Sequence, residues 1–327
     1  MFPNLLPRLR HTAILSAIAL ASAASLEAED IVQSQNVLAG STWNDPVNWG
    51  GYLVEPGNNY FTTPGFFAPV TAFVTNGVVW NYSSTMRDNP AGGTFLGDSL
   101  TLLDGTRLLG KIDAGNTSTV NLIFGGGIFF AGPNTAGSAT LAGTIRFEEG
   151  VHIGAIGVNP AVGGSFTQTI ASKVIGNEED VLQLTLLTEQ DALRLGHIVF
   201  TGDLSEFEGT LYVGTALSGS AAGSSYSVQS SSTTTTLVID TITFNNAGGD
   251  ATYELATNET FGALIVGGTQ LGAGTYDAEA LNLVAGGGSF FIGGGSITVV
   301  PEPSTVLLSL AGFTFAVVFG LRKRRVA

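Results

Sequence analysis

The stretch HIVFTGDLSEFEGTLYVG, residues 197–214, contains two apolar runs separated by a short segment rich in glycine and acidic residues. Alternation of apolar and polar side chains is typical of a β-strand with one buried face. Glycine between two strand patterns marks a corner or a tight turn. This stretch is therefore predicted to form a strand, a corner and a second strand.

Three further segments, 95–112, 118–132 and 138–157, follow the same plan, and 290–300 has the pattern of a strand. The units recur about every 20–25 residues, the length of one rung of a β-solenoid, in which each rung packs its apolar face on the next. We therefore predict an all-β chain with a right-handed parallel β-solenoid over residues 24–298. A β-sandwich or jelly roll, with strands about every 8–12 residues, remains the alternative.

Two segments depart from this pattern. The stretch VLQLTLLTEQDALRLGHIVF, residues 181–200, is expected to be helical around 187–195. The run SSSTTTTL, residues 230–237, is low in complexity and lacks the regular threonine spacing across rungs that an ice-facing array would need. We expect a flexible or edge-strand insert there.

Composition limits the classes of function. Of 327 residues, 45 are glycine, 44% are hydrophobic and 12% are charged, which favours a β-rich chain with a buried core over a disordered one. Residues 24–300 hold 6 cations against 25 acids. Such a surface repels nucleic acid and anionic lipid, so no nucleic-acid partner is expected. The absence of cysteine excludes disulfides and thiolate metal sites.

The first 23 residues have the order of a secretory signal peptide. A basic flank precedes the apolar run 12–20, and Ala21 and Ala23 supply a small-x-small cleavage site. The apolar run is too short to span a bilayer comfortably. We predict a signal helix within residues 1–23, cleavage after Ala23 and export of the rest.

The other end of the chain has the pattern of a membrane anchor. Residues 305–321 carry no charge and would form a helix about 25 Å long, slightly shorter than a hydrocarbon core of about 30 Å. Cations follow at once and are expected to stop translocation and hold this end in the cytoplasm: Arg322, Lys323, Arg324 and Arg325. The bulk of the protein would then lie outside.

Pro301, Glu302 and Pro303 stand just before this apolar run. Two prolines fix an extended, non-helical stretch with one exposed carboxylate, a rigid peptide suited to recognition by a processing enzyme. Together with the apolar helix and the basic cluster, residues 299–327 resemble the PEP-CTERM sorting domain of Gram-negative bacteria, also known as the "ice-binding protein C-terminal domain".

This resemblance implies a route for the protein. Exosortase would recognise and process the Pro301–Pro303 motif, with Arg322–Arg325 as the stop-transfer signal. The precursor would be anchored in the inner membrane, and the mature form would reside at the cell envelope or outside the cell, associated with exopolysaccharide or biofilm. The resemblance makes the chain a substrate of an enzyme and implies no enzymatic activity of its own.

Two stretches of the middle region resemble the β-helix repeats of autotransporter passenger domains. They are the W-N-x-x-x-N-W spacing in 41–51 and the G-D-L-S-x-F-x-G-T-L-x-V pattern in 200–214. Only the solenoid carries over from this likeness, and the secretion route does not. Trp43 and Trp49 are interpreted either as a sugar-stacking pair or as a plug over the first rung. In the second case Asn44 and Asn48 would bond the turn backbone.

Few residues suggest catalysis. His152 and His197 each lie in an apolar strand pattern, where a structural histidine is commoner than a base or a metal ligand. Glu148-Glu149 and 178–180 are adjacent acids at turn-like positions, expected to be solvated, and neighbours in a strand point to opposite faces. Four aspartates lie in glycine-rich corners but lack the repeated ladder of a calcium site: Asp98, Asp104, Asp113 and Asp203.

We therefore predict no catalytic, cofactor-binding or metal-binding residues. The chain is expected to be an exported, non-enzymatic surface or extracellular-matrix protein. The alternative is a carbohydrate-binding or polysaccharide-degrading protein on the same β-helix scaffold. Acids and a cation that converge in one groove would favour the enzyme.

Overall fold

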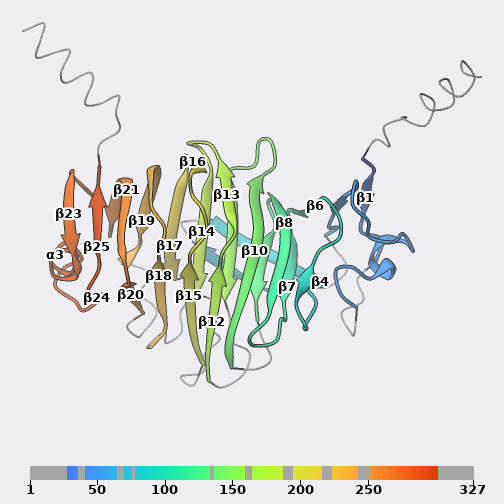
Figure 1. The fold of residues 1–327 in the computed structure, drawn as a ribbon, viewed down its shortest axis with the longest axis horizontal. Helices are drawn as coiled ribbons and strands as arrows, with labels where there is room; N and C mark the ends of the chain where they lie inside the picture. Colours follow the sequence, from blue (N-terminus) through green and yellow to red (C-terminus); the bar gives the residue numbers. More distant parts are fainter. Residues whose placement is uncertain are drawn as a thin grey trace, which may run out of the picture.

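The computed structural model describes residues 28–35, 41–64, 70–75, 78–132, 136–158, 164–186, 194–215, 223–241 and 251–300. Most of them belong to strands of two long sheets (Figure 1). The chain advances steadily along the long axis, so that the first described strand lies at one end of the body and the last at the other (Figure 1). The strands themselves lie across that axis.

The first sheet has thirteen strands within the described residues. Its main path, in spatial order, is β1 (Asp30–Val32), β2 (Asn59–Phe61), β6 (Ser99–Leu103), β8 (Thr117–Gly125), β10 (Gly137–Phe147), β12 (Gly164–Ile170), β15 (Arg194–Phe200), β18 (Ser225–Val228), β20 (Thr252–Leu255) and β24 (Phe291–Gly293). Three short strands lie off the path: β5 (Gly93–Thr94), β13 (Lys173–Gly176) and β16 (Glu206–Phe207).

The second sheet has twelve strands in the same part of the chain. In spatial order they are β23 (Gly274–Asp277), β25 (Ser296–Val299), β21 (Asn258–Val266), β19 (Ser232–Ile239), β17 (Thr210–Thr215), β14 (Val181–Leu186), β11 (Ile153–Val158), β9 (Ile128–Ala131), β7 (Thr106–Gly110), β4 (Val78–Arg87) and β3 (Val70–Thr75), with β22 (Thr269–Leu271) beside β21. The described residues also include two helical segments, the 3-10 helix η1 (Pro46–Trp49) and α3 (Ala278–Val284).

Strand pairing confirms a β-helix-like arrangement. From β6 onward the main strands of the two sheets alternate along the chain, and each pairs with the equivalent strand of the next rung. Pairing between the named strands is parallel except at β3–β4, β21–β22 and β23–β25. The antiparallel β-sandwich that the sequence left open is therefore not the observed fold. The expected all-β parallel architecture is confirmed at this level.

Rung length is greater than the sequence spacing predicted. Paired residues are 21 positions apart between β7 and β9, at Arg107 and Ile128. The offset is 30 between β12 and β15, at Gly164 and Arg194. It is 40 between β2 and β6, at Asn59 and Ser99, and 38 between β20 and β24, at Tyr253 and Phe291. The prediction of 20–25 residues therefore holds between β4 and β10 and is too short elsewhere, because more residues lie between the paired strands there.

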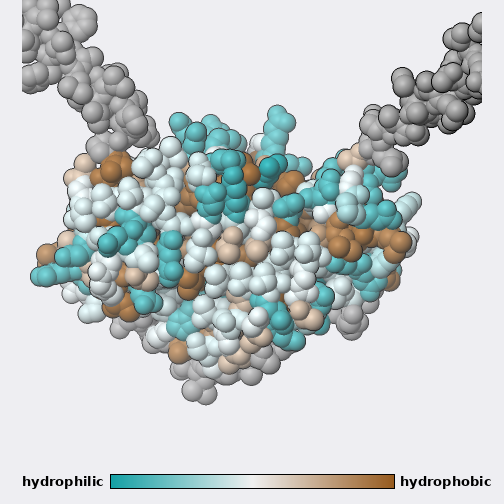
Figure 2. Space-filling model, viewed as in Figure 1, coloured by the Kyte–Doolittle hydropathy of each residue, from teal (hydrophilic) through white to brown (hydrophobic). Residues whose placement is uncertain are grey.

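Stacked apolar side chains build the interior. In the second sheet seven successive paired positions carry large apolar side chains that are at most 1% exposed: Leu108, Phe129, Ile156, Leu184, Val213, Ile239 and Val266. Burying each such side chain contributes about 1.5–3 kcal/mol. Polar and neutral side chains cover much of the outer surface in view (Figure 2). Each rung thus depends on its neighbours for its buried face.

The stretch 200–214 shows why its glycines are needed. It forms the end of β15, then β16 and β17. A Cβ at Gly202 would overlap the backbone oxygen of Ser172, and one at Gly209 would overlap that of Asp180. Both oxygens belong to the preceding rung, so glycine at these corners allows close stacking.

The structure corrects one local prediction and leaves most of another outside the described residues. Residues 232–239 form β19, which lies between β17 and β21 inside the second sheet, so the flexible or edge-strand insert is wrong. The Thr235 hydroxyl is fully buried and donates to the Phe207 oxygen at 2.7 Å, and β-branched threonine suits a pleated strand. Of the expected helix at 187–195, residues 187–193 lie outside the described residues and 194–195 begin β15.

Candidate functional site

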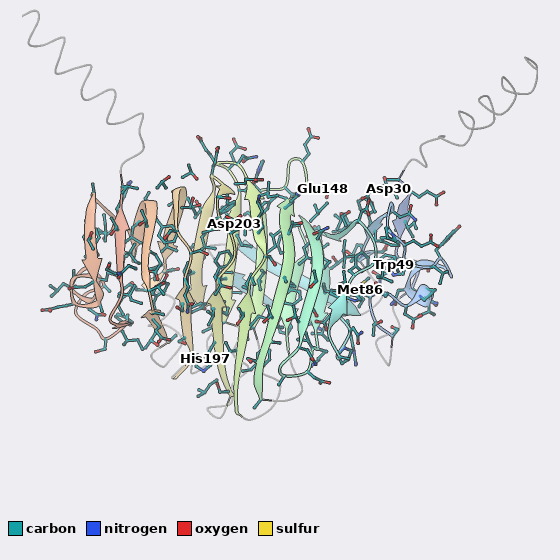
Figure 3. The ribbon with its side chains drawn as sticks, viewed as in Figure 1. Asp30, Trp49, Met86, Glu148, His197 and Asp203 are labelled. Atoms are coloured by element: carbon teal, nitrogen blue, oxygen red, sulfur yellow. The ribbon has the colours of Figure 1, made fainter. Side chains whose placement is uncertain are left out.

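Figure 3 shows how the titratable residues are distributed. Asp30 and Trp49 lie at the end of the body where the described chain begins, here called the N-terminal end. Asp203 lies toward one edge of the sheets and His197 toward the opposite edge (Figure 3). Asp203 and His197 therefore do not share one site.

An aromatic cluster closes the N-terminal end. Trp43 and Trp49 are 0% and 1% exposed. Trp49 meets Tyr60 edge-on with ring centroids 4.8 Å apart, and its Nε1–H donates to the backbone oxygen of Trp43 at 2.8 Å. Phe95 packs against Trp43 at 5.8 Å. The plug interpretation is confirmed and the sugar-stacking one is wrong, because neither indole is accessible.

The two asparagines of the W-N-x-x-x-N-W motif hold this plug in place. Asn48 donates from Nδ2 to the backbone oxygen of Thr42 at 2.9 Å. Asn44 donates to the oxygen of Thr94 at 2.8 Å and accepts from the N–H of Leu96 at 3.0 Å. The expected bonds to backbone are confirmed, and those of Asn44 tie the plug to the chain some fifty residues later.

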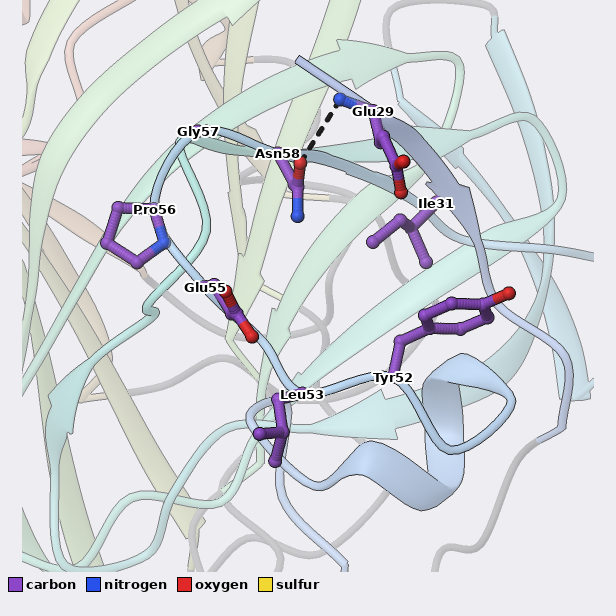
Figure 4. Close-up of a pocket in the computed structure, with 8 residues that line it drawn as sticks. All are labelled: Glu29, Ile31, Tyr52, Leu53, Glu55, Pro56, Gly57 and Asn58. Carbon is purple, nitrogen blue, oxygen red and sulfur yellow. Dashed lines mark hydrogen bonds between the residues drawn. The ribbon is translucent and has the colours of Figure 1, made fainter. Parts of the chain in front are cut away.

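An open pocket of about 310 Å³ lies beside the plug (Figure 4). This volume is at the lower end of the range for small-ligand sites. The lining comes from the start of β1 and from the loop that leads into β2: Glu29, Ile31, Tyr52, Leu53, Glu55, Pro56, Gly57 and Asn58. We call this feature the N-terminal pocket.

The N-terminal pocket combines apolar and acidic groups. Tyr52 and Leu53 are 61% and 65% exposed, and Glu29 and Glu55 are also exposed. The N–H of Glu29 donates to Asn58 Oδ1 at 3.1 Å, which fixes β1 against the loop (Figure 4). Carboxylates accept hydrogen bonds and attract cations, while a tyrosine ring offers a flat apolar face. The pocket therefore suits a ligand with cationic or hydroxyl groups beside apolar surface.

Sequence reasoning missed this pocket. Its signal is the run Tyr52-Leu53-Val54, in which only Val54 is buried. An apolar run between glycine and Glu55-Pro56 resembles an ordinary short strand, and nothing in its spacing says that two of the three side chains stay exposed.

His152 lies between two carboxylates. Its Nδ1 lies 3.1 Å from Asp180 Oδ1 and its Nε2 lies 3.3 Å from Glu179 Oε2. Asp180 is 3% exposed and its Oδ2 accepts the N–H of Asn177 at 2.8 Å, so the expectation that 178–180 is wholly solvated is wrong for Asp180. Both ring nitrogens of His152 contact carboxylate oxygens, which fits a structural role at this corner better than a catalytic base.

His197 is held within the first sheet. Its Nδ1 lies 2.8 Å from Ser225 Oγ on the next rung. Burial lowers the pKa of His197, with a smaller opposing effect of Glu254. Its contact joins successive rungs, which is a structural role.

Two of the glycine-corner aspartates accept hydrogen bonds from backbone N–H groups. Asp98 accepts the N–H of Gly57 at 2.8 Å, and Asp203 accepts the N–H of Ser205 at 2.8 Å, which lowers the pKa of Asp203. In the described part of the chain no group of three or more His, Cys, Asp or Glu side chains could hold a metal ion. Lys173 Nζ lies 2.5 Å from Glu206 Oε1 and 4.0 Å from Asp203 Oδ2 on the surface, so these charges pair with one another.

Besides Asp180, the carboxyl groups of Asp88 and Glu259 are buried. Asp88 is fully buried, accepting from the N–H of Lys111 at 2.7 Å and from the hydroxyl of Ser118 at 2.9 Å, and burial raises its pKa to about 7. Glu259 is 1% exposed, and burial likewise raises its pKa to about 7, opposed by its bond from Thr257. These groups bear on stability and do not line the pocket.

The predicted sorting residues Pro301, Glu302 and Pro303 lie outside the described residues. So do the stop-transfer cluster Arg322–Arg325 and the signal-cleavage positions Ala21 and Ala23. The structure as described contains no helix with the length and apolarity to cross a membrane.

Comparisons with protein-family models, with curated proteins and with solved structures give no match to this chain. The likeness to the sorting domain and to autotransporter repeats therefore rests on the sequence motifs alone.

Proposed function

We propose that the chain is an exported, non-enzymatic bacterial cell-surface or extracellular-matrix protein that exosortase sorts and processes at Pro301-Glu302-Pro303. The observation that carries this proposal is the order of three elements at residues 299–327: the Pro-Glu-Pro motif, the uncharged run and the basic cluster. In this proposal residues 1–23 direct export, and 24–298 form the mature body, a right-handed β-solenoid.

The architecture supports a scaffold role. The two ends of the described chain lie at opposite ends of an elongated body (Figure 1). A membrane helix after residue 300 would therefore hold the body by one end and leave the N-terminal pocket at the far end. This placement suits a surface protein that presents one end outward, in association with exopolysaccharide or biofilm.

Replacing Pro301, Glu302 and Pro303 together with alanine tests the sorting step. In a host with exosortase the variant should accumulate as an unprocessed, membrane-retained form, because the rigid recognition peptide is lost. Mass spectrometry of both ends of the protein, from envelope and medium fractions, measures the outcome. A control variant, Glu279→Ala, replaces an exposed acid of α3 outside the motif and should mature normally. Normal maturation of the motif variant, or native protein in the cytosol with both ends intact, would contradict the proposal.

A carbohydrate-binding role is the second candidate. The exposed ring of Tyr52 beside the carboxylates of Glu29 and Glu55 is the observation that favours it, since sugars combine apolar faces with hydroxyl donors. The pocket lining contains no cation, so it does not have the convergence of acids and a cation that a polysaccharide-degrading enzyme would show. A glycan array tests this candidate, and binding that Tyr52→Ala leaves unchanged would count against it.

A further inference from the structure

The first sheet ends in an open strand edge at the N-terminal end. Among the described strands, β1 pairs only with β2, with Asp30, Ile31 and Val32 opposite 59–61. Successive residues of a strand direct their backbone N–H and C=O groups to opposite edges of the strand. The oxygen of Glu29 and the N–H of Gln33 bond toward β2, at 2.9 and 2.8 Å. The N–H and C=O groups of Asp30 and Val32 therefore face away from the sheet.

These outward groups are available to another strand. Within the described residues no hydrogen bond to the backbone of Asp30 or Val32 is formed on that side. Both side chains are exposed, Val32 by 57%. An unpaired row of backbone donors and acceptors is a template for an added strand.

The opposite edge of the same sheet is closed. At β24 the Phe291 N–H donates to Asn282 Oδ1 at 2.9 Å, and Asn282 Nδ2 donates to the Phe291 oxygen at 2.9 Å. The side-chain amide of α3 thus takes the place of a further strand. As far as the described residues show, one edge of this sheet is blocked and the other is open.

The open edge is flanked by apolar side chains. Large exposed apolar residues in the described chain occur only at the two ends of the body: Val32, Tyr52, Leu53, Leu96, Leu283 and Ile292. Four of the six belong to the N-terminal end. Figure 2 shows apolar surface gathered at that end of the molecule. An added strand would find pockets and contacts for alternate apolar side chains here.

The same end carries exposed acids. Glu29, Asp30 and Glu55 are exposed around the edge and the pocket. The sequence contains no Lys, Arg or His from residue 12 to residue 86. A second copy of this end would bring like charges together, whereas a basic strand would be attracted and steered to it.

We propose that β1 and the N-terminal pocket form a docking edge for an extended, basic polypeptide segment that alternates cationic and apolar side chains. The segment pairs its backbone with Asp30 and Val32, places apolar side chains against Val32, Tyr52 and Leu53, and sets its cations near Glu29 and Glu55. This partner goes beyond the proposed sorting route, and a failure to bind it leaves that route intact.

A labelled decapeptide of alternating valine and lysine is the probe, titrated by fluorescence anisotropy into the purified full-length chain. A valine–glutamate decapeptide should bind at least about tenfold more weakly, because its charge has the wrong sign. A valine–lysine peptide N-methylated along one edge keeps its charge and side chains but cannot form backbone hydrogen bonds with β1. Its affinity should also fall by about tenfold or more.

Variants of the protein locate the site. Val32→Pro removes the outward N–H while leaving the bonds to β2, and it should weaken peptide binding about tenfold. Val32→Thr keeps this N–H, so its affinity for the peptide should stay within about twofold of that of the unmodified chain. Glu29→Gln with Glu55→Gln should lower affinity and its salt dependence, and Glu279→Gln at the other end should not. Circular dichroism checks folding, and the N-methylated peptide tests pairing even if Val32→Pro fails to fold.

Three results would overturn the proposal. Binding that survives both N-methylation and Val32→Pro would mean attraction by charge alone. Sedimentation that shows self-association, abolished by Val32→Pro and without peptide binding, would make a second copy the occupant. Glycan binding in the pocket with no peptide binding would assign this end to carbohydrate.

Discussion

Replacing Trp49 with alanine should destabilise only the N-terminal end of the body. The side chain is 1% exposed, meets Tyr60 edge-on and donates to Trp43. Truncating a buried tryptophan to alanine costs about 3–5 kcal/mol. Rungs of a solenoid contact only their neighbours, so the loss should weaken the first rungs and spare distant ones. A loss of about 4 kcal/mol corresponds to about a thousandfold rise in local opening.

Native-state hydrogen exchange measures this opening strand by strand. Amides of β2 and β6 should exchange faster by about that factor, and those of β21 and β25 should not change. Trp49→Phe is the matched control: it keeps an aromatic ring against Tyr60 but loses the indole hydrogen bond, so about 1–2 kcal/mol, or about five- to thirtyfold, is expected. An equal rise in all strands would show that the body opens as one unit, and no rise at all would mean that the indole is not packed.

Two further predictions concern titration and the closed edge. Because burial raises the pKa of Asp88 and of Glu259 to about 7, the folded chain keeps protons that the unfolded chain releases above about pH 4. The free energy of unfolding should therefore fall as pH rises from about 4 to about 7, by about 4 kcal/mol for Asp88. Urea denaturation midpoints measured across this pH range should show the fall, and Asp88→Asn should make the pH dependence shallower. An unchanged pH dependence in that variant would refute the assignment. Asn282→Ala should leave the backbone groups of Phe291 unbonded and increase self-association, measured by sedimentation velocity. The control Leu283→Ala, on the exposed face of α3, should not increase it. A monodisperse Asn282→Ala protein would show that the Asn282 amide is not what blocks the edge.

The sequence predicted the fold class because its signals are local. Strand alternation and the glycine corners of 200–214 report directly on backbone geometry, and the structure assigns them to β15, β16 and β17. The rung length was harder to predict from the sequence, because residues added between the two sheets leave the strand pattern unchanged. The threonine run at 230–237 was misjudged because composition does not show that Thr235 bonds an oxygen of the preceding rung.

The candidate site was harder to foresee. The plug could be predicted because two tryptophans in W-N-x-x-x-N-W need cover and the asparagines need backbone partners, and both are found. The N-terminal pocket depends on Glu29 and Glu55, which the fold brings to one cavity across 26 positions of chain. The burial of Asp88 and Asp180 depends on rung stacking, which no neighbouring residue reveals.

The alignment of strands across the long axis has a mechanical consequence. Tension applied between the two ends would act on the hydrogen bonds between neighbouring rungs and separate the rungs one after another. From Ile153 to its partner Val181 one rung holds 28 residues. Releasing it would yield about 90 Å of extended chain in place of about 5 Å of body. The molecule would therefore lengthen stepwise under modest force and absorb mechanical work as it does so.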